Sequence, residues 1–187
     1  MENWAFQPEV LATYARHYET GEIIPAELVA KIEAAANFNQ GFMTTELAAA
    51  AILDLKWHML ESLPVISSST PVISSEVEKS FVEEFEAKAC AEMGLIDEII
   101  PRYRTTYFAH IFSGGYSAGY YSYLWAEVLD KDAFELFMEK GIFDQETATA
   151  YRKNILEKGG SDEPMELYRR FRGADPDPAA FTRARGL

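Results

Sequence analysis

The sequence predicts an all-α protein. Residues that start helices (proline, serine, threonine and aspartate) and glycines that end them recur along the chain, and the apolar residues between them follow a helical spacing. No stretch alternates polar and apolar residues long enough to predict a strand. The chain has 187 residues and is 48% hydrophobic and 13% aromatic, which is typical of a globular protein with a substantial core. We expect a single helical domain over residues 1–187.

Three helices are predicted in the first third of the chain. The first covers residues 8–18, with a proline in its first turn. Its expected inner face consists of Val10, Leu11, Tyr14 and Tyr18. Pro25 opens the second helix. Thr44 is the expected cap of the third, which continues to about Leu60 and is apolar almost all round until Asp54, so it should lie centrally.

A short repeat separates these helices from the next one. The sequence Pro-Val-Ile-Ser-Ser occurs at residues 64–68 and again at residues 71–75. Serine, proline and β-branched residues disfavour a helix, so we interpret about residues 62–80 as a surface loop. An interaction strand is the alternative. Ser75 and Glu78 have the spacing of a capping box for the following helix, which should end at Gly94. The inner face of that helix is expected to consist of Val77, Phe81, Val82, Phe85 and Ala89.

Five further helices are predicted in the C-terminal part of the chain. They should run from the tyrosines after Gly115 through Leu129, from Asp132 to Gly141, from Asp144 to Lys158, from Pro164 to Gly173, and onward from Asp177–Pro178. Leu167, Tyr168 and Phe171 are expected to be the buried residues of the fourth.

Charge and cysteine content exclude several classes of protein. The net charge of -13 and the pI near 4.7 argue against nucleic-acid binding, because phosphate contacts need clustered lysine and arginine. The same charge disfavours an anionic membrane surface, and no apolar run is long enough to span a bilayer. The single cysteine, Cys90, excludes an internal disulfide and a cysteine-based zinc cluster. We expect it to be a buried small hydrophobe rather than a nucleophile, in a cytoplasmic protein.

The densest group of candidate functional residues lies at residues 110–125. His110 precedes two adjacent glycines, Gly114 and Gly115, which permit a sharp and mobile turn. Four tyrosines follow, and if they continue as a helix, Tyr116, Tyr120 and Tyr123 share one side. His110, Tyr116 and Tyr123 could then converge on a cleft as hydrogen-bond donors. The alternative is that the aromatic residues are core and the glycines only a tight turn. Tyr121 and Trp125, on a neighbouring stripe, are expected in the core.

The other histidines give no sign of a metal site. No His-Glu-x-x-His pattern is present, and no two histidines share a helical turn. His17 and His58 are each expected late in a helix, where a cation is favourable. The segment of residues 114–119 has neither a preceding strand nor a lysine, so it is not interpreted as a phosphate loop.

Residues 110–125 resemble the C-terminal signature of the thimet-oligopeptidase-like zinc metallopeptidases, most closely the peptidyl-dipeptidase branch. Other segments agree with that family in the same order, namely residues 2–5, 14–18, 38–42, 101–104 and 185–187. The resemblance covers nearly the whole chain except about residues 62–80.

This resemblance implies a zincin-like helical peptidase with a deep channel that admits short peptides. The family holds zinc with His-Glu-x-x-His and a later glutamate, all of which would precede residue 1. We therefore expect the C-terminal part of a larger enzyme that releases dipeptides from the C-terminus of oligopeptides, without zinc ligands and inactive alone. Its expected partners are short peptides and the N-terminal part of the enzyme, supplied upstream or by a separate chain.

The resemblance also assigns roles to single residues. His110, Tyr116 and Tyr123 match the family's substrate and transition-state hydrogen-bond donors. Gly114, Gly115 and Tyr120 are expected to contribute to substrate binding. The alternative from a different class is a non-enzymatic helical module that binds another protein.

Overall fold

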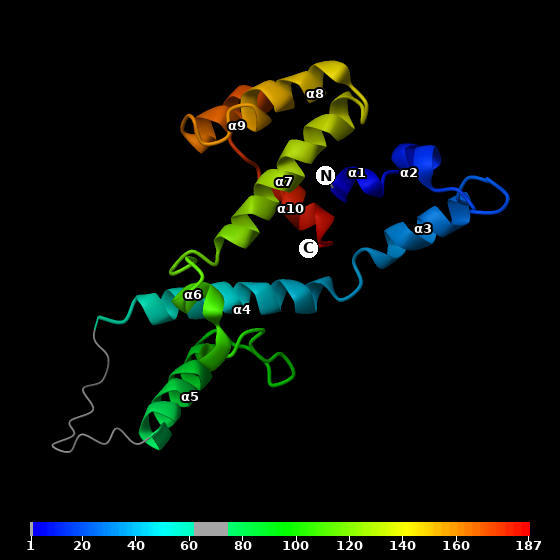
Figure 1. Ribbon diagram of the computed structural model, residues 1–187. Helices are drawn as coiled ribbons and strands as arrows, with labels where there is room; N and C mark the ends of the chain where they lie inside the picture. Colours follow the sequence, from blue (N-terminus) through cyan, green and yellow to red (C-terminus); the bar gives the residue numbers. More distant parts are fainter. Residues whose placement is uncertain (1, 62–74) are drawn as a thin grey trace. The chain divides into compact units, whose positions relative to one another are not determined.

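The computed structural model describes residues 2–61 and 75–187, and only the backbone of residues 75–80 (Figure 1). The described residues form helices and no strand, apart from an isolated antiparallel bridge between Arg16 and Ile23. The predicted all-α class is confirmed. The chain divides into two compact units, Met1–Phe38 with Ala126–Leu187, and Asn39–Trp125. The expectation that residues 1–187 form a single domain stays a prediction.

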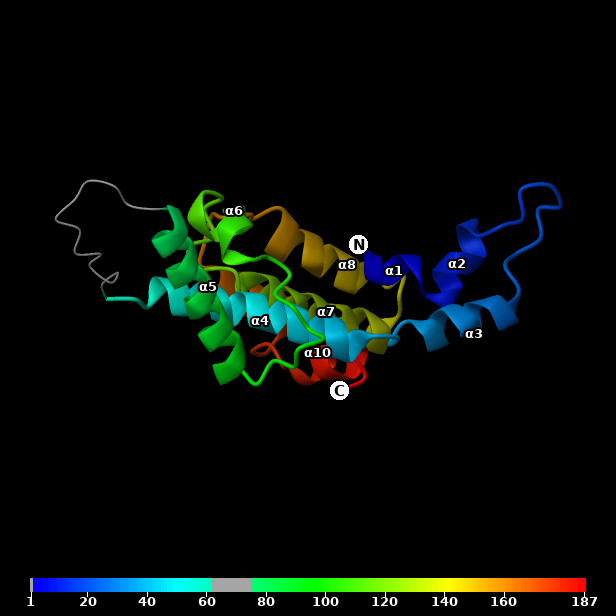
Figure 2. The ribbon, with the colours of Figure 1, turned by 90° about the horizontal axis from the view of Figure 1, so that it is seen from below.

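The first unit is built from short helices and most of one long helix. Its elements are α1 (Glu2–Ala5), α2 (Pro8–Tyr14), α3 (Ala26–Ala35), α7 (Ser122–Lys140) from Ala126 onward, α8 (Gln145–Tyr151), the π-helix η2 (Arg152–Leu156), α9 (Pro164–Arg172) and α10 (Ala179–Ala184). Figure 2 shows α8 running beside α7. A core of Phe134, Phe137, Ile142 and Phe171 lies among them. The Trp4 ring meets Phe134 and Phe137 edge-on at 4.6 and 4.8 Å, so α1 is packed onto α7.

Two predictions for the first unit were wrong. The first helix ends at Tyr14, where the chain turns into the Arg16–Ile23 bridge, and Tyr14 and Tyr18 are exposed rather than internal. His17 lies in that turn, where its Nδ1 accepts hydrogen bonds from two backbone N–H groups, and not at a helix end. The second error concerns α7, which is continuous to Lys140. Asp132 is therefore not a cap but a buried mid-helix residue.

The predicted start and stop residues after α7 agree with the structure. The Asp144 carboxylate accepts a hydrogen bond of 2.7 Å from the Thr147 backbone N–H and so caps α8. Pro164 occupies the first turn of α9, and Gly173 ends it with a φ of 81°. The expected buried residues Leu167, Tyr168 and Phe171 are buried.

The second unit contains α4 (Gln40–His58), α5 (Ser75–Glu92), the 3-10 helix η1 (Thr105–Tyr107), α6 (Ala109–Phe112) and the first turn of α7. Helix α4 begins four residues before Thr44, because Asn39 takes a left-handed backbone conformation (φ 59°) that separates it from the preceding turn. It buries one face, which includes Ala49–Ala51 and Leu53, whereas Ile52 is 40% exposed. The buried face also includes the carboxylate of Asp54.

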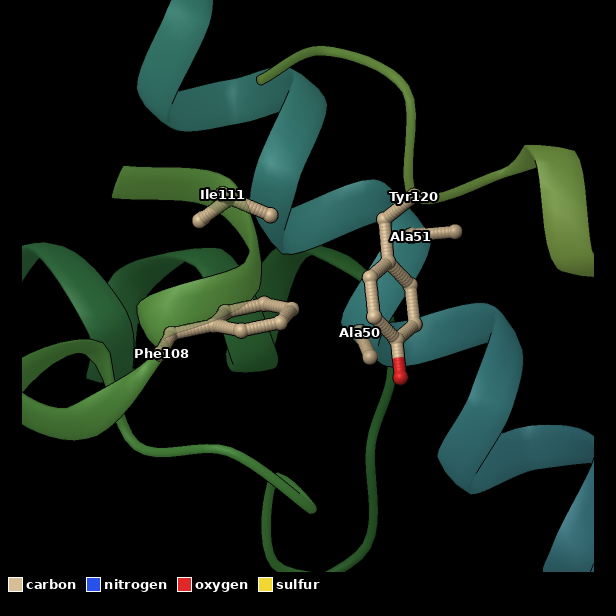
Figure 3. Close-up of a cluster of buried hydrophobic side chains, with 5 residues drawn as sticks. All are labelled: Ala50, Ala51, Phe108, Ile111 and Tyr120. Atoms are coloured by element: carbon tan, nitrogen blue, oxygen red, sulfur yellow. The ribbon is translucent and has the colours of Figure 1, made fainter. Parts of the chain in front are cut away.

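The core of the second unit forms where α4 meets the segment from Phe108 to Tyr120. Figure 3 shows Phe108 pointing toward Tyr120, beside Ala50 and Ala51 of α4. The Phe108 and Tyr120 ring centroids are 5.0 Å apart in an edge-to-face arrangement. Alanines on α4 leave room for these rings, which explains the run of small residues in that helix.

Helix α5 begins at Ser75, so residues 75–80 of the expected loop belong to a helix, and the rest of the repeat lies outside the described residues. Ala89 is buried, and Phe81 and Phe85 contact the Trp57 ring of α4 with centroids 6.1 and 4.0 Å away. Of the predicted inner face, Ala89 is thus buried, and Phe81, Val82 and Phe85 are partly buried. The Val77 side chain lies outside the described residues. No helix of the described ranges is long and apolar enough to cross a membrane.

Candidate functional site

The structure brings the three predicted donor residues into one aromatic group in the second unit. The His110 and Tyr116 ring centroids are 6.0 Å apart. Tyr116 and Tyr123 stack with centroids 5.5 Å apart and planes inclined by 18°. Tyr120 contacts two members of the group, with its ring centroid 5.7 Å from that of His110 and 4.9 Å from that of Tyr123. Four residues that the sequence marked as a candidate site therefore lie together.

The group is held by a loop and not by the continuous helix that the sequence suggested. Helix α6 ends at Phe112 and α7 begins at Ser122, so Tyr116, Tyr120 and Tyr121 are loop residues. The backbone N–H of Tyr116 donates a hydrogen bond of 3.0 Å to the His110 carbonyl, which folds the loop back on α6. The proximity of the rings thus comes from loop folding and not from helical periodicity.

Gly114 and Gly115 are both required by the geometry of the loop. A Cβ atom at Gly114 would lie 2.9 Å from the Cα atom of His110, closer than real side chains approach. Gly115 has a φ of 83°, which a side chain would strain. The two glycines therefore permit the tight return of the chain that places Tyr116 near His110.

The carboxylate of Asp54 anchors the second half of this loop. Its oxygens accept hydrogen bonds from the backbone N–H groups of Ala118 (3.0 Å) and Tyr120 (2.9 Å). Ser117 adds a bond of 2.6 Å from its hydroxyl to the Ile111 carbonyl. Sequence reasoning missed Asp54, although a single charge inside the apolar run of residues 47–55 was a detectable signal.

Tyr120 lies in the core and is shielded from solvent. Its side chain is only 4% exposed, and burial is the main reason why its pKa is raised to about 12. Its hydroxyl also shares a hydrogen bond with Tyr103, a residue that the sequence identified only as part of a basic-aromatic connector. The Tyr103 ring lies 4.8 Å from the His110 ring, so Tyr103 is a further member of the group.

Tyr116 and Tyr123 are the accessible members of the group. Their side chains are 38% and 40% exposed, and a hydrogen bond between the two hydroxyls raises the pKa of Tyr123. Tyr121 and Trp125, expected in the core, are instead 52% and 44% exposed. Tyr121 precedes α7, which begins only at Ser122, so the expected helical stripe does not include it. Because the hydroxyl groups of Tyr116 and Tyr123 are accessible, each can donate a hydrogen bond to a ligand instead of bonding to the other.

The described residues do not fit a zinc site. Among the side chains that the structure describes, those of residues 2–61 and 81–187, no group of three or more histidine, cysteine, aspartate or glutamate residues is arranged to hold a metal ion. Asp54 and His58 form a pair, with Oδ1 2.8 Å from Nδ1, but the aspartate oxygens are occupied by backbone N–H groups. Around His110 the neighbours are rings and not carboxylates.

Comparison with known proteins places the sequence of this chain in a family. The sequence profile of Peptidase family M3 matches residues 1–187. The chain is 41% identical to the dipeptidyl carboxypeptidase of Escherichia coli (strain K12) over 187 residues, and 38% identical to the oligopeptidase A of the same strain over 197 residues. Both alignments cover the whole chain and 26% of the relative. A probable cytosolic oligopeptidase A of Arabidopsis thaliana is 34% identical, with 25% of its length covered.

These matches include the His110–Trp125 stretch, since they extend over the full chain. The chain spans about a quarter of the length of these relatives. The resemblance found in the sequence motifs is confirmed, and this chain belongs to Peptidase family M3.

Proposed function

We propose that this chain supplies the substrate-binding side of a peptidase site that acts on short peptides and releases dipeptides from their carboxyl ends. Membership of Peptidase family M3 supports the reaction class. The name of the E. coli relative, dipeptidyl carboxypeptidase, supports the position of cleavage. Short peptides are accordingly the proposed ligands of the His110–Tyr123 group.

In this proposal His110, Tyr116 and Tyr123 donate hydrogen bonds to the peptide. When water adds to a peptide carbonyl, negative charge develops on the carbonyl oxygen, and donors that are already oriented stabilise it. The observation that carries the proposal is the stacked, half-exposed Tyr116–Tyr123 pair next to His110. The hydroxyls that bond to each other in the free chain would turn to the substrate oxygen.

Gly114 and Gly115 are proposed to let the tyrosine loop close over a bound peptide. Their lack of side chains permits both the tight return at His110 and the left-handed φ of Gly115. Closure of such loops excludes water and completes the set of donors. The buried Tyr120 is proposed to support substrate binding by packing its ring against that of Tyr123.

Peptidase family M3 is generally zinc-dependent. Because the described residues do not fit a metal site, we place the zinc ligands outside them, in a part of the enzyme that this chain joins. The chain alone is therefore proposed to be inactive. We also propose a cytoplasmic location, supported by the single cysteine and by the cytosolic relative in Arabidopsis.

The first experiment tests peptide binding to the chain itself. An unblocked tetrapeptide is titrated into the isotope-labelled chain, and NMR shift changes are mapped. We expect changes centred on His110, Tyr116 and Tyr123, and Kd about 5- to 10-fold weaker in Tyr116→Phe or Tyr123→Phe, because a hydrogen bond contributes about 1 kcal/mol. The exposed Tyr121→Phe is the matched control. Equal weakening in Tyr121→Phe, or no shift changes at the site, would contradict the proposal.

The second experiment tests catalysis in a complete enzyme. Residues 1–187 replace the matching segment of the E. coli dipeptidyl carboxypeptidase, and dipeptide release is measured. Loss of one transition-state donor should lower kcat by about 10²–10³ in Tyr123→Phe, with Tyr121→Phe unchanged. A chimera that folds and releases dipeptides equally well with Tyr123→Phe would refute the assigned role. A protein ligand bound regardless of these tyrosines would favour the alternative interaction module.

A further inference from the structure

We propose that Asp54 is a positioning residue of the peptide-binding loop, in that its buried carboxylate fixes the backbone of Ala118 and Tyr120 and thereby holds the Tyr116–Tyr123 pair in register. The proposal rests on the proposed function for the peptide-binding role of the pair. The geometry of the anchor itself does not depend on that function.

Asp54 is a fully buried carboxylate in an otherwise apolar part of α4. Its side chain is 0% exposed, one turn before the C-terminal end of an alanine- and leucine-rich helix. A buried carboxylate without partners is strongly unfavourable, and charged residues are kept inside proteins where partners compensate them. The partners here are the His58 side chain on the same helix and the backbone of the tyrosine loop, more than sixty residues away.

Each oxygen of Asp54 has its own role. Oδ1 accepts the Ala118 N–H at 3.0 Å, and Oδ2 accepts the Tyr120 N–H at 2.9 Å. Because the carboxylate is rigid and planar, the two bonds fix both the distance and the orientation of the Ala118–Tyr120 backbone relative to α4. His58, one turn further along α4, places Nδ1 2.8 Å from Oδ1 and completes the site from the solvent side.

The anchored backbone is strained, which makes the anchor necessary. Ala118 has a φ of 53°, a left-handed conformation that is unfavourable for any residue with a Cβ atom. Its N–H points at Asp54 in that conformation. Without the Asp54 acceptor, no hydrogen bond would offset the strain at Ala118, and its backbone would return to a common conformation.

Such a change would act directly on the tyrosines. Tyr120 follows Ala118 by two residues, and its ring contacts both His110 (5.7 Å) and Tyr123 (4.9 Å). Tyr116 precedes Ala118 by two residues and stacks on Tyr123. A change in the Ala118 backbone would therefore move the Tyr116 and Tyr120 rings relative to each other.

Glu86 of α5 offers a matched control within the same unit. It is also buried (4% exposed) and also accepts a backbone N–H, from Thr105 at 2.7 Å, with a second bond of 2.9 Å from the Thr105 hydroxyl. It differs from Asp54 in anchoring the η1 segment and not the tyrosine loop, and in pairing its other oxygen with the Arg104 guanidinium. Comparing Asp54→Asn with Glu86→Gln separates the loss of a buried charge from the loss of the loop anchor.

The test is hydrogen exchange of single amides, followed by NMR in the whole chain. In Asp54→Asn one acceptor oxygen becomes an amide NH₂ that cannot accept, so exchange of Ala118 or Tyr120 should accelerate about tenfold or more, with the α4 amides unaffected. The tyrosine titration should show the Tyr123 pKa moving back toward its ordinary value as the pair separates. In Glu86→Gln only the Thr105 amide should accelerate.

Peptide binding then tests the functional part. We expect Kd for the unblocked tetrapeptide to weaken about tenfold in Asp54→Asn and less than twofold in Glu86→Gln. Unchanged exchange at both loop amides would overturn the proposal, and so would equal weakening of binding in the two variants.

Two further measurements can each contradict the proposed role of Asp54. If Asp54→Asn does not fold, the wild-type chain should still show scalar coupling across the hydrogen bonds from the Ala118 and Tyr120 amides to the Asp54 carboxylate, and its absence would overturn the anchor. If the wild-type chain binds no peptide, the proposed function fails, whereas the exchange and Tyr123 titration data still decide the role of Asp54.

Discussion

Tyr116 and Tyr123 stack ring on ring, 5.5 Å apart, although Tyr116 lies in a loop and Tyr123 in the first turn of α7. Their spacing of seven residues would be expected within one helix, yet no helix connects them. The loop between them instead turns through Ala118 and is fixed to Asp54. The pair therefore depends on contacts that are distant in sequence, and its properties report on the state of the loop.

The first prediction concerns the ionisation of this pair. The pKa of Tyr123 is raised chiefly by its hydrogen bond with Tyr116. In Tyr116→Phe that bond is lost, so we expect the pKa of Tyr123 to fall toward its ordinary value. A spectrophotometric tyrosine titration measures it. Tyr121→Phe, which removes an exposed hydroxyl outside the pair, should leave the Tyr123 titration unchanged. If both variants give the same curve, the two hydroxyls are not bonded in solution.

The second prediction concerns stability at high pH. Burial raises the pKa of Tyr120 to about 12, whereas an unfolded tyrosine titrates near 10. Between these two pKa values the folded state keeps the Tyr120 proton that the unfolded state releases. The contribution of Tyr120 to stability is therefore complete below about pH 10 and is lost as the pH rises toward 12. We expect a loss of up to about 2 kcal/mol over this interval.

Urea unfolding at pH 8 and at the alkaline end of this interval measures that loss. In Tyr120→Phe the group no longer titrates, so the difference in unfolding free energy between the two pH values should be smaller than in the wild type. Tyr168, whose pKa burial also raises, contributes equally to both proteins. The same difference in both proteins would show that Tyr120 is not the titrating group.

The third prediction concerns the buried carboxylate of the first unit. The Tyr168 hydroxyl donates a hydrogen bond of 2.5 Å to Asp132, and the Arg172 guanidinium lies 3.3 Å from its other oxygen. Asp132→Ala would leave a buried hydroxyl and a half-buried cation without this acceptor. We expect the free energy of unfolding to fall by about 3 kcal/mol in thermal or urea denaturation.

Asp175→Ala is the matched control for this change. Asp175 also pairs with an arginine, Arg169, at 2.5 Å, but its side chain is 71% exposed. An exposed ion pair contributes about 0–1 kcal/mol. Equal losses in the two variants would mean that burial of Asp132 does not determine its importance.

The fourth prediction concerns the tight return of the chain at His110. In Gly114→Ala the new Cβ atom would lie 2.9 Å from the His110 Cα and 3.0 Å from its carbonyl oxygen. The backbone must shift to relieve this overlap, so we expect a loss of about 1–3 kcal/mol in stability, together with weaker peptide binding. Differential scanning calorimetry and the peptide titration measure the two effects.

Gly41→Ala provides the comparison for this glycine. Gly41 lies in the first turn of α4, and nothing is within 4 Å of an added Cβ atom. Because alanine favours a helix, this substitution should be neutral or slightly stabilising. Gly114→Ala as stable as Gly41→Ala would contradict the close approach.

The local signals in the sequence were reliable where they acted within a few residues. Asp144 caps α8, Pro164 starts α9 and Gly173 ends it, as their residue types predict. These effects depend only on neighbouring backbone groups. The helix boundaries predicted at Tyr18, Thr44 and Asp132 were wrong. The chain turns after Tyr14, Asn39 has a left-handed backbone, and Asp132 is buried inside α7 with a hydrogen bond from Tyr168, and these features override the local preference.

The sequence by itself determined the all-α class, the family, and the identity of His110, Tyr116 and Tyr123 as candidate donors, because residue type and order carry this information. Only the tertiary structure decided how these residues meet. The loop between Ser113 and Tyr121 has no periodicity from which its path could be predicted, and the path is fixed by a buried carboxylate of α4 that bonds to its backbone. Backbone N–H groups are the same in every residue except proline, so the sequence does not show which of them Asp54 will bind.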